Sequence, residues 1–314
     1  MALFLHAVSA VTIILLLTAT GYFCGAKGWM KAETKAFLSK FLLTLAVPCM
    51  CVHGIRNNLD REMIFSSLRL LAVPLLCNTV SFLLAFALVR ILKVPRRRSG
   101  VFMVMCGLSN AMFIGYPMCL ELFGEACVPY VMLYFLANTC FTQTIAMWLI
   151  RRSGEQAESE ERGSWKESLR FFVSPTVLGP FVGLLIVWLD ITLPSFVMSY
   201  LGYMSGVVSP MALVLAGYII YEMGLDSLRL DRDLVVALLF RFALAPALYI
   251  LCCMQFGVGS LARDTFVVES AMPVVTQSVV AASRYGADER FAAEGAALST
   301  VASFVVIPVL IVLM

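Results

Sequence analysis

Long apolar segments alternate with short polar ones along the 314-residue chain. Ten apolar segments approach the ~20 residues that a helix needs to cross ~30 Å of hydrocarbon. They cover residues 3–24, 36–54, 68–92, 101–122, 128–150, 171–189, 196–221, 234–256, 264–283 and 291–313. The pattern therefore predicts ten membrane-spanning helices. We interpret the first as a retained helix rather than a signal peptide, because no basic residue precedes it and the "CGAKG" that follows contains a lysine.

The fourth segment contains residues that weaken a helix. Within "CGLSNAMFIGYPM" (residues 106–118), Ser109 and Asn110 are followed by Gly115 and Pro117. A proline removes a backbone donor and clashes with the preceding turn. Carbonyl groups freed in this way must bond to protein or water, because lipid cannot satisfy them. We therefore expect a break in this helix near the middle of the membrane.

The most polar stretch of the chain, "RRSGEQAESEERGSWKESLR" (residues 151–170), falls between the fifth and sixth segments and is typical of a solvated linker. It separates a first repeat, residues 1–150, from a second repeat, residues 171–314, each with five segments. An odd number of spans gives the second half the opposite orientation, as an inverted repeat requires. Pro210 also follows Pro48 by the offset that brings the fourth segment onto the ninth.

The ninth segment is interrupted at the matching place. Its sequence "ESAMPVVTQSVV" (residues 269–280) carries Pro273 where the offset places Ala111 of the fourth segment. Interrupted helices at corresponding positions of two halves indicate the binding site of a transporter.

Composition supports a membrane location. Hydrophobic residues make up 61% of the chain and charged residues 14%, with a mean hydropathy of +0.91. A soluble domain has an apolar share of about 45–50%, so lipid must solvate much of this surface. The net charge of +3 is too small to suggest nucleic-acid binding.

The Lys and Arg residues of the loops predict the orientation. One alternate set of loops holds most of them: Lys27, Lys31, Lys35, Arg90, Lys93, Arg96, Arg97, Arg98, Arg151, Arg152, Arg162, Lys166, Arg170, Arg229, Arg232, Arg284 and Arg290. The other set holds Arg56, Arg61, Arg69 and Arg263. Positive charge stays on the cytoplasmic side. We expect a multi-pass protein of the cytoplasmic membrane with both termini outside and the central linker inside.

Enzyme, metal and cofactor chemistry finds little support. Most of the ten cysteines lie within apolar segments without C-x-x-C pairs, and the chain has two histidines, so the cysteines are interpreted as packing residues. H-E-x-x-H and Walker motifs are missing, and "FGVGSL" (residues 256–261) follows a helix rather than a strand. We predict a protein that is not an enzyme and uses no cofactor or bound metal.

The substrate-binding candidates lie around the two breaks. They are Asn110, Gly115, Tyr116 and Pro117 in the fourth segment, Pro273, Thr276 and Gln277 in the ninth, and Asn138 in the fifth. The Asn110 amide offers two donors and an acceptor, and the ends of half-helices supply N–H groups that favour an anion. The alternative is that Asn110 only caps the broken helix. Asn138, with Thr139, Thr142 and Gln143, extends the cavity or forms hydrogen bonds between helices.

Three ionisable residues lie within apolar segments: Glu269, Arg241 and Glu294. Such groups are costly in hydrocarbon, usually face a cavity, and mark proton or ion paths. We regard them as candidates for coupling transport to a proton or sodium ion. The alternative for Glu269 is a structural ion pair with Arg241.

The sequence resembles the auxin efflux carrier family, which includes the plant PIN-type auxin carriers and bacterial members, some of them malonate-type carboxylate transporters. "SNAMFIGYP" is similar to the fourth-span motif N-x-x-x-x-G-x-P of that family, and "ESAMPVVTQSVVAASRYG" to its ninth span. "LSKFLLTLAVPCMC", "SPTVLGPFVGLLIVWLDITLP" and "SPMALVLAGYII" look like the second, sixth and seventh spans, so the likeness covers nearly the whole chain.

The resemblance implies an all-α membrane protein of ten transmembrane helices in two inverted five-helix repeats, similar to NhaA-type and bile-acid-type transporters. Broken helices four and nine would cross at the substrate site. Helices one, two, six and seven would form a scaffold, often a homodimer, against which helices three to five and eight to ten move. Two features depart from the plant carriers: the central loop is short, and Glu269 stands where plant members tend to have glutamine.

Together these observations predict a secondary transporter that moves small organic anions, auxin-like or malonate-like carboxylates, across the bilayer by an elevator-like alternating-access mechanism. A membrane receptor or a channel-like protein for a small ligand is the alternative.

Overall fold

The computed structural model describes residues 2–58, 61–154, 175–224 and 229–314. Within these ranges every regular element is a helix, and two extended segments meet in one isolated antiparallel bridge. Residues 155–170 of the expected linker and residues 171–174 at the start of the second repeat lie outside the described residues. The chain is thus all-helical wherever the structure describes it, as the apolar pattern predicts.

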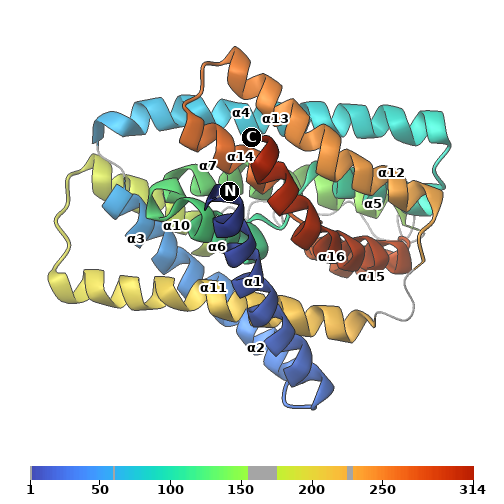
Figure 1. Ribbon diagram of the computed structural model, residues 1–314, viewed down its shortest axis with the longest axis horizontal. Coiled ribbons are helices and arrows are strands. Elements are labelled where there is room, and N and C mark those ends of the chain that lie inside the picture. Colours follow the sequence, from blue (N-terminus) through green and yellow to red (C-terminus); the bar gives the residue numbers. More distant parts are fainter. Residues whose placement is uncertain (1, 59–60, 155–174, 225–228) are drawn as a thin grey trace.

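The helices of the first half are α1 (Ala2–Ala26), α2 (Ala32–Phe41), η1 (Leu42–Ala46), α3 (Val47–Asn58), α4 (Arg61–Leu92), α5 (Arg96–Gly107), η2 (Ala111–Gly115), α6 (Tyr116–Phe123), η3 (Glu125–Cys127), α7 (Val128–Phe141), η4 (Thr142–Ala146) and α8 (Met147–Ser153). Those of the second half are α10 (Pro175–Trp188), α11 (Ser195–Met223), α12 (Arg232–Leu239), η7 (Phe240–Leu244), α13 (Ala245–Gln255), α14 (Ser260–Ser270), α15 (Gln277–Tyr285) and α16 (Glu289–Leu313). Figure 1 shows their arrangement.

Six helical stretches of the described residues are long and apolar enough to cross a membrane. They are Ala32–Asn58, Arg69–Leu92, Glu125–Ser153, Ser195–Glu222, Arg232–Gln255 and Glu289–Leu313. Shorter apolar helices cover Thr12–Ala26, Ala111–Phe123 and Leu178–Trp188. Large apolar side chains such as Leu16, Leu83 and Tyr203 are exposed on the outside of the bundle, which suits a lipid-facing surface. The fold is that of a multi-pass membrane protein.

Glycines bring α1 and α11 into backbone contact. A Cβ on Gly21 would lie 1.8 Å from the Val214 carbonyl oxygen, and one on Gly217 would lie 1.8 Å from the Thr18 carbonyl oxygen. A Cβ on Gly25 would collide with the Tyr221 ring at 2.4 Å. The G-x-x-x-G of α1 is therefore a packing motif, since small residues allow membrane helices to approach closely.

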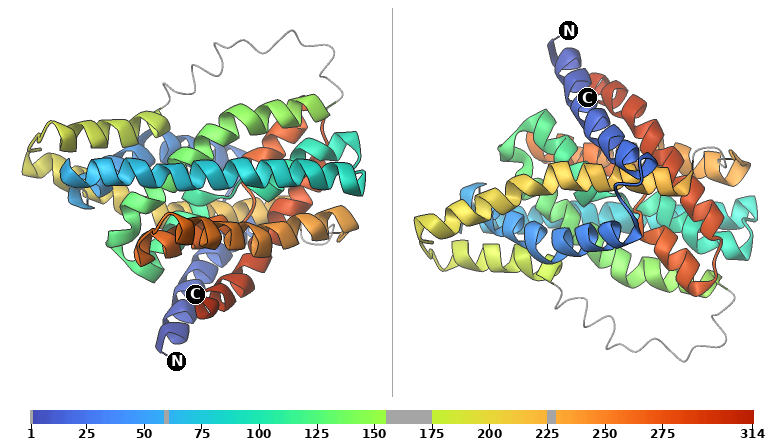
Figure 2. Two further views of the ribbon diagram at one scale, coloured as in Figure 1. Left: turned by 90° about the horizontal axis from the view of Figure 1, so that it is seen from above. Right: turned by 90° about the horizontal axis from the view of Figure 1, so that it is seen from below.

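Many of the remaining contacts lie within two groups of helices, and the two groups also touch each other through α1 and α16, α3 and α7, and α11 and η2. α3 packs against α10 and α11, and α11 against α1. In the second group, α4 packs against α5, α7 and α13, α5 against α8 and α12, and α15 against α16. The two termini of the chain lie next to each other, on α1 and α16, which project together from one side of the molecule (Figure 2).

Prolines follow widened helical turns at three places. The π-helical turns η1, η2 and η7 end at Ala46, Gly115 and Leu244, and a proline comes two residues later, at Pro48, Pro117 and Pro246. A proline removes an N–H donor and crowds the preceding turn, and a π-turn accommodates such a change within a continuous helix. Pro117 thus sits in the first turn of α6 rather than at the break that we expected it to cause.

One arginine joins three helix starts at an end of the molecule, the right side of Figure 1. The Arg98 guanidinium, on α5, pairs with Asp231 and, at 2.7 Å, with Asp288. These aspartates cap α12 and α16 by accepting from the N–H groups of Leu234 and Phe291. The arrangement fixes the ends of α5, α12 and α16 relative to one another.

Candidate functional site

The two interrupted helices meet at their breaks. α5 ends at Gly107 and η2 begins at Ala111, while α14 ends at Ser270 and α15 begins at Gln277. Between them, Ser109 and Val274 form the antiparallel bridge, and the Asn110 N–H donates to the Pro273 carbonyl oxygen at 2.7 Å. Backbone groups that leave a helix within a membrane need partners from the protein, and here each break supplies them for the other.

Polar side chains complete the support of these extended segments. Asn138 on α7 donates its amide to the Ser109 carbonyl oxygen at 2.9 Å and accepts from the Ser109 N–H at 3.3 Å. The Ser109 and Tyr134 hydroxyls lie 3.0 Å apart, and the Val274 N–H donates to the Ser299 hydroxyl at 3.0 Å. The Asn138 side chain therefore holds the backbone of the break in place with both ends of its amide.

A buried arginine binds the carboxyl-terminal ends of α5 and α14, the two helices that precede the breaks. Arg241, 1% exposed, donates from Nε and Nη2 to the Met105 carbonyl oxygen at 2.9 and 2.6 Å. Its Nη1 donates to the Ser270 carbonyl oxygen at 3.0 Å. Helix carboxyl ends carry partial negative charge, which a cation stabilises. Arg241 thus neutralises the ends of α5 and α14 together.

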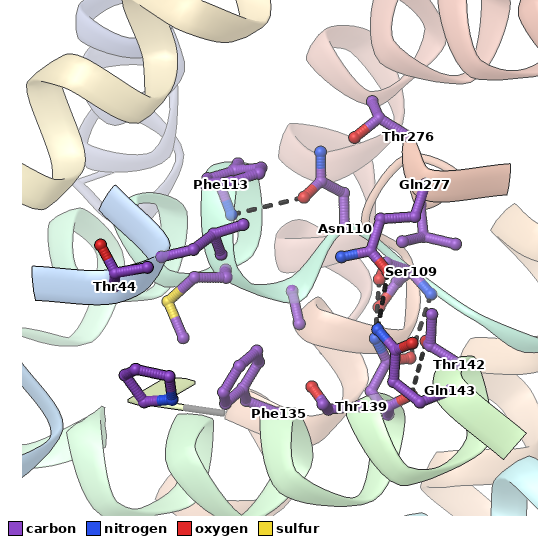
Figure 3. A pocket seen from close by; sticks show the side chains of 16 residues that line it. Thr44, Ser109, Asn110, Phe113, Phe135, Thr139, Thr142, Gln143, Thr276 and Gln277 are labelled. Carbon is purple, nitrogen blue, oxygen red and sulfur yellow. Dashed lines mark hydrogen bonds between the residues drawn. The ribbon is translucent and has the colours of Figure 1, made fainter. Parts of the chain in front are cut away.

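The crossing is the place where the break at residues 108–110 meets the break at residues 271–276. A cavity of about 290 Å³ lies beside it. Its lining comes from five parts of the chain: Leu43, Thr44, Ser109, Asn110, Ala111, Met112, Phe113, Phe135, Asn138, Thr139, Thr142, Gln143, Pro175, Val275, Thr276 and Gln277. Figure 3 shows these side chains around the space. The described lining includes no Asp, Glu, Lys, Arg or His. The cavity is polar on the side of the breaks and apolar around Phe113 and Phe135.

Asn110 has a divided role in this geometry. Its side-chain oxygen accepts from the Phe113 N–H at 3.4 Å and so caps η2. Figure 3 shows the amide oxygen toward Phe113 and the nitrogen turned away from it. Among the described residues, the hydrogen bond of this side chain is made by its oxygen.

Two helix amino ends border the same cavity. Ala111 to Phe113 begin η2, and Val275 to Gln277 lead into α15. Across the cavity, the Gln143 amide donates to the Gln277 side-chain oxygen at 3.1 Å. The lining thus offers neutral donors and the positive ends of helix dipoles.

The structure brings four of the eight substrate-binding candidates to the cavity: Asn110, Asn138, Thr276 and Gln277. The other four lie around it. Tyr116 and Pro117 are buried in the first turn of α6, Pro273 accepts from Asn110, and Gly115 packs against Glu269.

The ionisable candidates lie outside the cavity lining. Glu269 is fully buried at the end of α14, and within the described chain it makes no ion pair with Arg241, whose donors go to backbone carbonyls. Glu294 on α16 accepts from Arg290, four residues earlier, at 2.9 Å. Instead of the ion pair considered as the alternative for Glu269, Arg241 binds backbone carbonyl oxygens and Glu269 accepts from the Cys119 thiol.

Several cavity residues were not among those identified from the sequence. Leu43 and Thr44 lie in the π-turn η1, Phe135 lies on α7, and Pro175 begins α10. Thr44 is a polar residue inside an apolar segment, and that mismatch was a usable signal. The apolar residues had none, because any membrane helix contains many like them.

Comparison with known proteins agrees with this architecture. The sequence profile of a family described as membrane transport protein matches residues 6–311. An uncharacterized transporter of Methanocaldococcus jannaschii is 25% identical over 304 residues, covering 95% of both chains. An uncharacterized transporter of Methanothermobacter thermautotrophicus is 22% identical over 311 residues, covering 98% of both chains. These likenesses indicate a transport protein and not an enzyme. Because the profile spans nearly the whole chain, this protein belongs to the membrane transport protein family.

Proposed function

We propose that this protein is a secondary transporter of small organic anions, with a carboxylate bound in the cavity beside Asn110. The observation that supports it most directly is the distribution of charge at the crossing. Arg241 neutralises the carboxyl ends of α5 and α14, whereas the amino ends of η2 and α15 face a cavity whose described lining carries no ionised side chain.

Helix amino ends bind anions through free N–H groups and the positive end of the dipole. In this cavity the Asn110 amide adds donors, and Thr276 and Gln277 add neutral polar groups. A carboxylate is then held without a fixed cation, which permits its release on either side of the membrane. A neutral ligand would gain less from these dipoles.

The remaining walls favour one carboxylate attached to an apolar body. Leu43, Met112, Phe113 and Phe135 form an apolar side of the cavity. A second carboxylate placed there would lose its hydration without a cation to replace it, which is costly. We therefore rank auxin-like aromatic monocarboxylates above malonate-like dicarboxylates as substrates.

The packing groups support an elevator-like movement. We propose that α1, α2–α3, α10 and α11 form the scaffold of a ten-helix, inverted-repeat fold, and that the two broken helices move with the other spans. The glycine contacts between α1 and α11 suit a rigid frame, and Arg98 ties α5, α12 and α16 into the moving part.

The proposal extends to orientation. With the central linker cytoplasmic and both termini outside, a cavity that is lined by Pro175 would lie in the cytoplasmic half of the membrane. A homodimer through the scaffold helices, and residence in the cytoplasmic membrane, follow from the resemblance to auxin efflux carriers and remain part of the proposal.

Purified protein in liposomes tests the function directly. We expect saturable uptake of radiolabelled phenylacetate, inhibited by other aromatic monocarboxylates and only weakly by malonate. Phenylacetamide, which has the same body without the charge, should neither inhibit nor be carried. Binding of phenylacetate without any flux would instead favour a receptor, and flux that does not saturate would favour a channel.

A further inference from the structure

Glu269 occupies an enclosed position at the crossing, apart from the cavity. It lies in the last turn of α14 and is 0% exposed. The Cys119 thiol of α6 donates to its Oε1 at 3.7 Å, and its Oε2 has no hydrogen-bond partner. This carboxyl group is thus buried with one weak donor.

The carboxyl group also contacts the other broken helix. A Cβ on Gly115, the last residue of η2, would lie 2.2 Å from the Glu269 Oε2 and 2.7 Å from its Cδ. Only glycine leaves room for the carboxyl group there. Glu269 therefore fills the contact between α14, which precedes the second break, and η2–α6, which follows the first break.

The titratable groups around Glu269 are few. They are Cys119 on α6, Cys127 on η3 and Tyr134 on α7, with Tyr249 of α13 behind Tyr134, while η2 carries no titratable residue. The Arg241 guanidinium of η7 donates to the carbonyl oxygen of the next residue in α14 and to Met105, and Glu294 of α16 pairs with Arg290. The described surroundings offer no cation in contact with the carboxyl group.

We propose that Glu269 is a proton-binding site of the crossing, protonated in this structure, and that loss of its proton opens the contact between α14 and η2. An ionised carboxylate without a cation or strong donors is strongly disfavoured in a dry site. To ionise, Oε2 must gain water, and the side of Gly115 is where the packing has to part to admit it. Only a proton leaves or binds, and no covalent bond changes.

A proton fits this site better than a metal ion. Hard cations are held by several oxygen ligands. The described contacts of the carboxyl group are with the Cys119 thiol and with Gly115, and neither side chain supplies an oxygen ligand. The proposal rests on the proposed function only for its consequence, which is that the movement of the crossing depends on pH.

Infrared spectroscopy of the wild-type protein and of two variants tests protonation without any substrate. Protein reconstituted in lipid at neutral pH should show the carbonyl stretch of a buried protonated carboxylic acid. Glu269→Gln should abolish that band, and Glu294→Gln, which changes the acid paired with Arg290, should leave it. If the band is absent from the wild-type protein, or survives in Glu269→Gln, then Glu269 is not a protonated site and the proposal is wrong.

Hydrogen exchange of the peptide around Gly115 tests the opening. After correction for intrinsic exchange, deuterium uptake by η2 should rise with pH in the wild-type protein and stay constant in Glu269→Gln. Gly115→Ala should raise it at every pH, because the added methyl group displaces the carboxyl group. Equal pH dependence in the wild-type protein and Glu269→Gln would refute the link. Neither measurement depends on phenylacetate uptake, so a failure here is distinct from a failure of the proposed function.

Discussion

The Asn110 N–H donates to the Pro273 carbonyl oxygen at 2.7 Å, and this bond joins the two helix breaks that lie in different halves of the chain. Neither break could exist in lipid by itself, because each leaves backbone groups without helical partners. The bond therefore makes the site a joint property of both halves. It also places Asn110 at the edge of the cavity.

Replacing Asn110 should separate capping from binding. Asn110→Ala removes the acceptor for the Phe113 N–H and the donors to the anion, so it should lower both stability and affinity. A hydrogen bond to a charged group is worth about 1.5–3 kcal/mol, so phenylacetate binding should weaken by about one to two decades, measured by calorimetry on the purified protein.

Asn110→Asp is the matched control. Aspartate caps a helix as well as asparagine does, so thermal stability should remain close to that of the wild-type protein. Its negative charge and missing amide donors should nevertheless abolish binding of the anion at neutral pH. Near-normal affinity in a well-folded Asn110→Ala protein would show that Asn110 is a cap only.

Arg241 should be critical for folding. Arg241→Met leaves the carbonyl oxygens of Met105 and Ser270 without donors in a dry site, at a cost of about 1–3 kcal/mol for each. We expect a loss of about 2–5 kcal/mol, seen as a much lower melting temperature in detergent. Arg241→Lys keeps the charge but not the fork of donors, so it should recover about half of the loss. A melting temperature unchanged in Arg241→Met would contradict the role.

The pairing of Asp288 with Arg98 should depend on pH. Burial raises the pKa of Asp288, but the Phe291 N–H and the Arg98 guanidinium outweigh it and hold the pKa below its ordinary value of 3.8. Because the folded-state pKa is depressed, the stabilisation is present above about pH 4 and is lost as the pH falls through the lowered value.

Asp288→Asn keeps the cap and removes the charge. It should therefore lower the free energy of unfolding at pH 7 by about 1 kcal/mol or less, seen as a modestly lower melting temperature, since water screens a pair at this edge of the molecule. The difference from the wild-type protein should shrink as the pH falls through the lowered pKa of Asp288. A difference that persists at low pH would mean that the charge does not act through ionisation of Asp288.

A disulfide tests the movement of one packing group against the other. A Cβ on Gly54 of α3 would lie 3.6 Å from the Val128 Cβ of α7, close to the mean of about 3.8 Å in disulfides. Oxidised Gly54→Cys/Val128→Cys protein should bind phenylacetate but not carry it, and reduction should restore uptake.

The control pair lies within the proposed scaffold. A Cβ on Gly183 of α10 would lie 3.2 Å from the Ile55 Cβ of α3, slightly closer than the usual ~3.5–4.5 Å. After a small separation of the two helices, Ile55→Cys/Gly183→Cys protein should form the bridge and keep its uptake. Full uptake by protein with a complete Gly54–Val128 bridge, verified by mass spectrometry of the linked peptides, would rule out the elevator-like movement.

The interruptions were the most predictable part of the site. Asn110 and Pro273 stood out because polar and helix-breaking residues are conspicuous in an apolar segment, and the structure leaves helical geometry at both places. Pro117 misled us about the position of the first break. Its effect is absorbed by the π-turn η2, whereas the chain leaves the helix at Leu108, where no proline stands.

The partners of polar residues were less predictable. The Arg290–Glu294 pair lies at i and i+4, a spacing that sequence alone can reveal, but we had considered Glu294 as a coupling residue. The partners of Arg241 are backbone carbonyls on two other helices. Every residue has such a carbonyl, so no side-chain pattern could identify them. The same holds for Asn138 and the Ser109 backbone.

The close approach of α1 and α11 has a consequence for biosynthesis. Gly21 meets Val214, and Gly217 meets Thr18, through contacts that leave no room for a side chain. Chains fold from the amino terminus as they are made, so α1 enters the membrane long before α11 has been translated. Its glycine face must wait in contact with lipid, or with the insertion machinery, until α11 in the second half of the chain has emerged. We therefore expect that residues 1–150 do not complete their packing on their own, because α1 lacks its glycine-mediated partner until α11 is made.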